Sequence, residues 1–451
     1  MSAKLYVYYI ICLIINLISV QNNEIIIPFY SKLSELPKNL TPSKFIEALI
    51  YNNLYTKVSI GTPSQNLNFL INFNDYDTYI IHDNEYNNFS SSTFNKERKE
   101  GYYYSSDYSY AYFASDKITL GNNISDFNLS FFYVEKGKKE PFISSTGIIG
   151  FGIGQMRNFN FKRSFIDQLK QKQLIKNYQF TLIFNDNDFD GKIILEKNIY
   201  EDHPEANFFY DYSLFTNDYS YTYYWGWKYM TTNYNSEILP IKNIYLKPEL
   251  GLILLNYDLK EILLKKFFEE KIKEKKCYEL LYKTYYFYYC EKDTKINNFG
   301  KFEFLLKRQS MNITLECKDL FHEYNNYLFF MIVFTKNCQI QDIYLGYPFF
   351  KKYNTLFNID TKNIGYYDIK INYNSIDTNN NNDNKRNNND KGKKDDKNKN
   401  MMKYDNNNET IKIILALGLI LGILGIFYLI FYLYRGFKRK SKGKLFEELN
   451  S

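Results

Sequence analysis

Short runs in which apolar and polar residues alternate fill the middle of this chain, between residues 51 and 373. Clear examples, each bounded by Gly, Asn, Asp or Ser, lie at residues 55–60, 66–73, 117–120 and 179–184. Alternation with a period of two is typical of strands that bury one face. Apolar residues recur at helical spacing at residues 164–174 and 260–273, which predicts two helices packed on a core. The pattern therefore predicts an all-β region.

The two ends of the chain show a different pattern. Residues 1–20 combine Lys4 with an apolar stretch, which predicts a signal peptide; a membrane anchor is the alternative, but the stretch is short for one. Residues 411–434 are almost continuously apolar and long enough for a transmembrane helix. The basic tail at residues 435–451 is expected to stay cytoplasmic. We therefore expect a single-pass, type I protein of the secretory pathway or cell surface, with its ectodomain lumenal or extracellular.

Composition adds a stalk and argues against nucleic-acid binding. Residues 374–410 are almost entirely Asn, Asp and Lys, so they cannot bury enough apolar surface to fold and should form a disordered stalk. The net charge is +7, and much of the basic excess lies near the C-terminus without a nucleic-acid-binding signature. Aromatic residues make up 19% of the chain, which is ample to fill a large core.

The polar residues with special chemistry give few signals. Four cysteines in an exported region predict two disulfides with three possible pairings, and free buried thiols are the alternative; they are Cys277, Cys290, Cys317 and Cys338. Six Asn-x-Ser/Thr sequences permit glycosylation, at Asn39, Asn88, Asn123, Asn128, Asn312 and Asn408. Three histidines lack metal-ligand spacing and are expected at the surface, at His82, His203 and His322. We expect no metal and no cofactor.

Five motifs in order resemble the pepsin family of aspartic proteases. Residues 55–65 include the Ile-Gly-Thr-Pro-Ser-Gln turn, and residues 91–94 read Ser-Ser-Thr-Phe. Residues 146–152 read Thr-Gly-Ile-Ile-Gly-Phe-Gly, and residues 345–350 and 357–365 resemble the family's two closing motifs. The resemblance implies an all-β, bilobal pepsin-like fold. Each motif alone is weak, but five in the family's order are specific.

The resemblance also locates the family's two catalytic aspartates. Counting from the Gly-Thr-Pro turn places the first on Asn72, within Asn-Phe-Asn. The second is expected at Asn256, within Asn-Tyr-Asp, after a similar apolar run. Tyr104 lies twelve residues before Asp116, as the family's flap tyrosine lies before its Asp-x-Val strand, although the neighbouring glycines are absent and a chance match is as good an interpretation.

Asparagine at both positions would abolish the family's chemistry. An aspartic protease needs two carboxyls that share one proton, so that one activates water and the other protonates the scissile carbonyl. An asparagine amide cannot exchange protons in this way. We therefore expect a catalytically inactive relative that binds a peptide or protein between its lobes. Two alternatives stay open: a divergent active endopeptidase, and a cell-surface receptor or adhesin that uses the fold as a scaffold.

The predicted organisation follows from these segments. Residues 21–50 are either a prosegment-like extension or an N-terminal strand, and the sequence leaves the two open. Residues 51–200 should form the N-terminal lobe and residues 201–373 the C-terminal lobe. The expected partners are a peptide or protein ligand, and the membrane through the C-terminal helix, with no nucleic acid.

Overall fold

The computed structural model of the chain describes residues 24–37, 39–74, 77–81, 85–97, 102–104, 108–121, 124–137, 146–152, 164–185, 189–197, 208–212, 214–216, 223–228, 231–305 and 312–367. The predicted signal peptide, stalk, transmembrane helix and tail lie outside these residues. Within them, none of the helices has both the length and the apolar character needed to cross a membrane. Strands far outnumber helices, which confirms the all-β prediction.

The elements of the first half are mostly strands. They are β1 (Ile25–Ser31), β2 (Leu54–Ile60), β3 (Gln65–Asn72), β4 (Tyr79–Ile81), β5 (Asn95–Lys96), β6 (Tyr102–Tyr104), β7 (Tyr108–Leu120), β8 (Ile124–Gly137), β9 (Gly147–Gly150), β10 (Gln179–Phe184) and β11 (Gly191–Leu195). The helical elements are η1 (Lys32–Glu35), α2 (Pro42–Ile50), η2 (Asn88–Ser90) and α3 (Phe165–Gln171). The predicted strand at residues 179–184 is therefore found with the expected bounds.

The second half follows the same plan. Its strands are β12 (Phe208–Tyr212), β13 (Leu214–Thr216), β14 (Tyr223–Lys228), β15 (Thr231–Tyr234), β16 (Glu237–Leu239), β17 (Asn243–Leu246), β18 (Ile253–Asn256), β19 (Cys277–Tyr282), β20 (Tyr285–Glu291), β21 (Lys301–Leu305), β22 (Asn312–Glu316), β23 (Phe321–Tyr324), β24 (Tyr327–Phe330), β25 (Ile332–Thr335), β26 (Asp342–Leu345), β27 (Asn354–Asn358) and β28 (Asn363–Tyr367). Its helical elements are η3 (Tyr257–Leu259), α5 (Lys260–Leu263), η4 (Leu264–Phe268), α6 (Glu269–Lys273), α7 (Cys317–Leu320) and α8 (Tyr347–Lys352).

Both predicted helices are present. Ser164 caps α3, because its hydroxyl accepts a hydrogen bond from the amide of Asp167 at 2.9 Å. Residues 260–273 form one helical stretch that changes from α5 through the π-helical η4 to α6. Phe267 and Phe268 of η4 are buried, which agrees with the predicted core-packing role.

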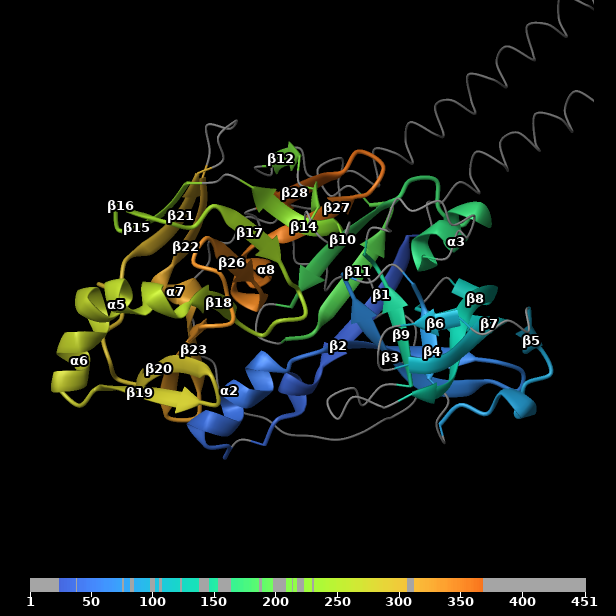
Figure 1. The fold of residues 1–451 in the computed structure, drawn as a ribbon, viewed down its shortest axis with the longest axis horizontal. Coiled ribbons are helices and arrows are strands. Elements are labelled where there is room, and N and C mark those ends of the chain that lie inside the picture. The colour runs from blue at the N-terminus through green and yellow to red at the C-terminus, as the bar shows by residue number, and fades with distance from the viewer. Residues whose placement is uncertain are drawn as a thin grey trace, which may run out of the picture. The chain divides into compact units, whose positions relative to one another are not determined.

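The two halves have the same strand order. Figure 1 shows β3, β4, β7 and β8 of the first half at the right of the view, and β17, β26 and β18 of the second half toward the left. In the first half the order is β2-β3-β9-β4-β8-β7, and in the second it is β14-β17-β26-β18-β25-β20. Directions agree at each step: β3 lies parallel to β9 as β17 lies parallel to β26, and β4 lies antiparallel to β9 as β18 lies antiparallel to β26. The pairs β4–β8 and β18–β25 are both parallel. The fold is therefore an internal repeat, as a bilobal pepsin-like fold requires.

A further sheet joins strands from both halves. Its order is β12-β28-β27-β10-β11-β1, so β10 from the first half pairs directly with β27 from the second. β1 continues from this sheet into the first repeat, because Ile25–Phe29 pair with β11, whereas Tyr30 and Ser31 pair with β2. Strands from both predicted lobes thus share one hydrogen-bonded ladder.

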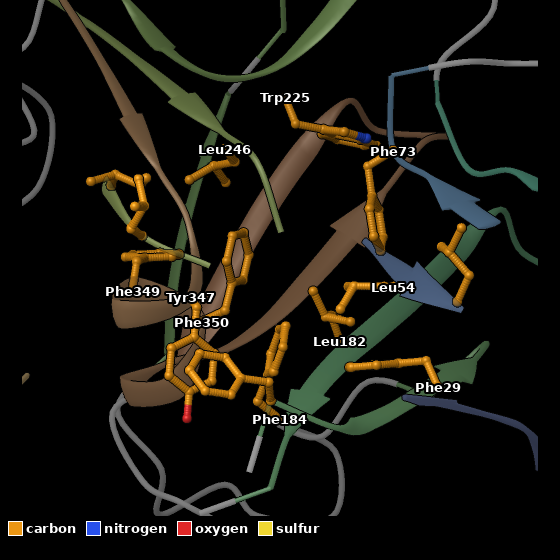
Figure 2. Packing of buried hydrophobic residues seen from close by; sticks show 14 of the residues in the cluster. Phe29, Leu54, Phe73, Leu182, Phe184, Trp225, Leu246, Tyr347, Phe349 and Phe350 are labelled. Atoms are coloured by element: carbon orange, nitrogen blue, oxygen red, sulfur yellow. The ribbon is translucent and has the colours of Figure 1, made fainter. Parts of the chain in front are cut away.

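One large apolar cluster runs through this joining region (Figure 2). Figure 2 shows Phe73 from the end of β3 and Leu246 from the end of β17 within it, together with Trp225 of β14. The rings of Trp225 and Phe357 lie 4.9 Å apart in an edge-to-face arrangement. The ends of the two equivalent strands are therefore anchored in the same core.

The disulfide prediction is half right. Cys277 and Cys290 are directly opposite on β19 and β20 and form a disulfide. Cys317 and Cys338 are free, so the second expected bridge is absent. Cys338 is buried, and burial raises the pKa of its thiol to about 12.

His322, which was expected at the surface, is only partly exposed, and Asn88, whose sequence permits glycosylation, is buried. His82 and His203 lie outside the described residues. His322 is half-buried, with its ring 5.9 Å from Phe45 and 5.3 Å from Phe189. Asn88 is only 9% exposed and accepts a hydrogen bond from the Tyr133 hydroxyl at 3.3 Å. A glycan on Asn88 does not fit this fold, whereas Asn39 is exposed.

Candidate active site

The equivalent strands β3 and β17 end beside equivalent glycines. Asn72, the last residue of β3, pairs with Gly150 at the end of β9. The last residues of β17 and β26 pair with each other, so the next residues, Lys247 and Gly346, occupy the corresponding positions. Lys247 is therefore the counterpart of Asn72.

The third strand of each repeat gives the same alignment. Tyr79 of β4 and Leu254 of β18 pair with the residues two positions before these glycines. Tyr79 follows Asn72 by seven residues, and Leu254 follows Lys247 by seven. The triplet Asn72-Phe73-Asn74 thus corresponds to Lys247-Pro248-Glu249.

The prediction that Asn256 is the second member of the pair is wrong. Asn256 ends β18, so its counterpart in the first half is Ile81 at the end of β4. The confusion has a local cause, because Asn72 and Asn256 both end an apolar strand and both accept a hydrogen bond at 2.8 Å from the amide two residues later. In Asn256 this bond caps η3, and its side-chain amide donates to the carbonyl of Cys338.

The two triplets contact each other through three polar side chains. The Asn74 amide donates to Glu249 Oε1 at 2.7 Å, and the Lys247 ammonium donates to Asn74 Oδ1. Lys247 Nζ also lies 3.8 Å from Glu249 Oε1. Asn74 therefore bridges an ion pair across the two halves of the molecule.

This polar cluster is mostly shielded from water. The side chains of Lys247 and Glu249 are 18% and 19% exposed, and Glu249 Oε2 is buried without a hydrogen-bond partner. The formal charges of the ammonium and the carboxylate cancel. The Glu249 carboxylate is bound to an amide and an ammonium, and neither can share a proton as a second carboxyl would.

Apolar packing holds the first triplet rigidly. Phe73 is 2% exposed, and its ring lies 5.9 Å from Phe151 and 6.1 Å from Phe180. The backbone continues this attachment, because the amide of Phe151 donates to the carbonyl of Asn72 at 2.7 Å. Core contacts and the backbone hydrogen bond to Phe151 therefore hold Asn72 in place, together with the bond that its side chain accepts from the amide of Asn74.

The first two motifs meet in space near the base of the β6–β7 pair. The Ser91 hydroxyl accepts from the amide of Thr62 at 3.1 Å, and Thr93 donates to Asp116 at 2.6 Å. Asp116 is fully buried and also accepts from the hydroxyl of Tyr86 at 2.8 Å. Motifs separated by about thirty residues thus form one hydrogen-bonded unit.

Tyr104 lies at the end of β6, which pairs antiparallel with the start of β7. A flap is formed by such an antiparallel pair of strands, so the backbone here is compatible with one. That Tyr104 is a flap tyrosine stays a prediction. Within the described part of the chain, no three His, Cys, Asp or Glu side chains gather where they could hold a metal ion.

Sequence reasoning missed Lys247 and Glu249, although one signal pointed to them. Gly150 ends β9 and Gly346 directly follows β26, each after two apolar residues. The strands that run parallel to β9 and β26 end at Asn72 and just before Lys247. That relation depends on strand pairing, which a count of residues along the chain does not contain.

Comparison with known proteins agrees with the fold. A family model described as eukaryotic aspartyl protease matches residues 53–368, which is more than half of the chain. No curated protein matches the chain in a sequence search.

Proposed function

Since this chain belongs to the eukaryotic aspartyl protease family, we propose that it is an inactive member that binds a peptide or protein without cleaving it. The observation that carries the proposal is the pair of equivalent strand ends, which bear Asn72 and Lys247. Neither side chain is a carboxyl, whereas the family's reaction requires two carboxyls that share one proton.

Glu249 does not restore the missing chemistry. It is the only carboxylate in the two triplets, and its partners are Asn74 and Lys247. The family's reaction needs one proton shared between two carboxyls, and no second carboxyl is present in the two triplets. The ion pair supports a structural role for Glu249, in which it ties the halves together.

Ligand binding is supported by the retained scaffold. The joined sheets and the β6–β7 pair persist although the acids are gone. Extended peptides bind to such folds largely through main-chain hydrogen bonds, which do not need the acids. The disulfide and the family membership indicate a secretory-pathway or extracellular protein, and the apolar C-terminal segment supports membrane anchoring.

Peptide hydrolysis by the purified full chain tests the proposal, between about pH 4 and about pH 7 where family acids operate. The natural chain should be inert. A variant with Asn72→Asp, Lys247→Asp and Glu249→Gly rebuilds two facing carboxyls and should cleave. A matched variant with Asn72→Asp, Asn256→Asp and Glu249→Gly places the second acid on the wrong strand and should stay inert.

Each result has a clear meaning. Cleavage by the natural chain that a pepsin-type inhibitor blocks would overturn the proposal and favour a divergent active enzyme. Cleavage by the Asn256→Asp variant alone would overturn the strand assignment. If neither variant cleaves, capture of extended peptides from a synthetic library by the natural chain decides whether a binding function stands.

A further inference from the structure

Residues 24–51, which we name the N-terminal brace, contact both halves of the molecule. In the first half, β1 lies between β11 and β2, with Ile25–Phe29 paired to β11 and Tyr30 and Ser31 paired to β2. Ile27 is fully buried and Phe29 is 3% exposed. The brace thus supplies an internal strand, not an edge strand laid on a finished sheet.

The helix of the brace packs on the second half. The ring of Phe45 in α2 stacks on Tyr324 at 4.1 Å and lies 4.6 Å from Phe329. Ile46 and Leu49 of the same helix are fully buried. Apolar burial of this extent ties the brace to the cores of both halves at once.

Polar contacts also connect the brace to both halves of the molecule. In the first half, the amide of Ser31 donates to Asp190 at 2.8 Å, and its hydroxyl donates to Asn52 at 2.5 Å. In the second half, the hydroxyl of Tyr282 donates to Glu47, and that of Tyr324 donates to the carbonyl of Pro37. Removal of the brace would leave buried or half-buried polar groups without these partners.

One contact connects the brace to the candidate site. The amide of Gly251 donates to the carbonyl of Leu49 at 3.0 Å. Gly251 lies four residues after Lys247, in the loop between β17 and β18. A Cβ on Gly251 would lie 2.9 Å from that carbonyl oxygen and 3.1 Å from Leu33, so the loop and the brace are closely packed.

We propose that the brace stays in the mature protein and holds the loop that carries Lys247 and Glu249. The alternative is that the brace is a prosegment and is removed. Its removal would expose the strand edges of β11 and β2, together with the surface under α2. The inference goes beyond the proposed function, because it concerns maturation and site position and does not depend on whether the chain cleaves peptides.

The N-terminus of the mature protein tests the first part. The full chain is expressed in a eukaryotic secretory pathway, purified from membranes, and its N-terminus is determined by sequencing and intact mass. We expect the chain to begin at or before Ile25. A mature chain that begins after Ser31 would overturn the proposal, because β1 would then be missing.

Hydrogen exchange tests the second part in the same full-length protein. Phe45→Ala should loosen α2 and speed exchange in residues 247–251 at least tenfold, because the Gly251 amide loses a fixed acceptor. Lys44→Ala is the matched control, since Lys44 is exposed on the same helix. Equal exchange of the loop in both variants would overturn the positioning role. The N-terminal measurement uses the natural chain, so it does not depend on whether a variant folds.

Discussion

The ends of β3 and β17 occupy equivalent places in two copies of one strand arrangement, yet they carry different chemistry. Asn72, Phe73 and Asn74 form the first triplet, a neutral one with a buried ring at its centre. Lys247 and Glu249 flank Pro248 in the second, which is charged. The repeat therefore conserves backbone geometry more strictly than side chains, because strand pairing depends on main-chain hydrogen bonds and the core.

The family's catalytic arrangement also differs in its electrostatics from the one found at these strand ends. Two carboxyls at facing strand ends repel each other unless they share a proton. An ammonium, an amide and a carboxylate in the same place attract one another and need no proton exchange. The contact between the triplets thereby becomes a fixed link between the halves.

The largest effect should come from the core under the first triplet. Phe73→Ala should lower the free energy of unfolding by about 3–5 kcal/mol, because it empties a site shared by both halves. Chemical denaturation of the full chain measures this. Phe89→Ala is the control, since Phe89 is 91% exposed and its loss should change stability by about 0.5 kcal/mol or less. Equal effects would contradict the packing.

The Cys277–Cys290 disulfide lies in the second half of the molecule, so a reducing agent should lower the stability of that half. Replacing Cys277 and Cys290 together by Ser should cost about 2–4 kcal/mol, because the unfolded chain gains freedom. Cys317→Ser should change little, since that thiol is free. Thermal unfolding with and without reductant distinguishes the variants, and a natural chain insensitive to reductant would contradict the expectation.

Acid should weaken the contact between the brace and the second half. Burial, with help from Lys351, lowers the pKa of His322 from 6.5 to about 4. The unfolded state therefore binds more protons between these values, so stability is full above about pH 6.5 and falls by about 1.4 kcal/mol per pH unit toward pH 4. His322→Phe should flatten this part of the curve. If the stability of the His322→Phe variant falls with pH as steeply as that of the natural chain, other groups cause the loss of stability in acid.

The smallest effect should come from the polar link between the triplets. Asn74→Ala should cost about 1–2 kcal/mol, because Lys247 and Glu249 each lose a hydrogen bond. A double-mutant cycle with Lys247→Met should show coupling of about 0.5 kcal/mol or more. Lys242→Met, at an exposed position, serves as the uncoupled control. Strict additivity of Asn74→Ala with Lys247→Met would show that the link contributes nothing.

The sequence alone determined the fold class and the first strand end. Period-two patterns predicted strands such as β10 with the right bounds, and helical spacing predicted α3 and the stretch from α5 to α6. The motifs identified the family, which the family model confirms. They also placed Asn72 at the end of β3, because the distance from the Gly-Thr-Pro turn is covered by one uninterrupted strand.

Only the tertiary structure decided the second position, the partners of the cysteines and the place of the brace. Asn256 and Lys247 lie nine residues apart, and the sequence near Asn256 looks more like that near Asn72. Lys247 is identified as the equivalent residue by its pairing beside Gly346, which brings together residues about a hundred positions apart. Local patterns record which residues prefer a strand, whereas register between distant strands is set by packing of the whole fold.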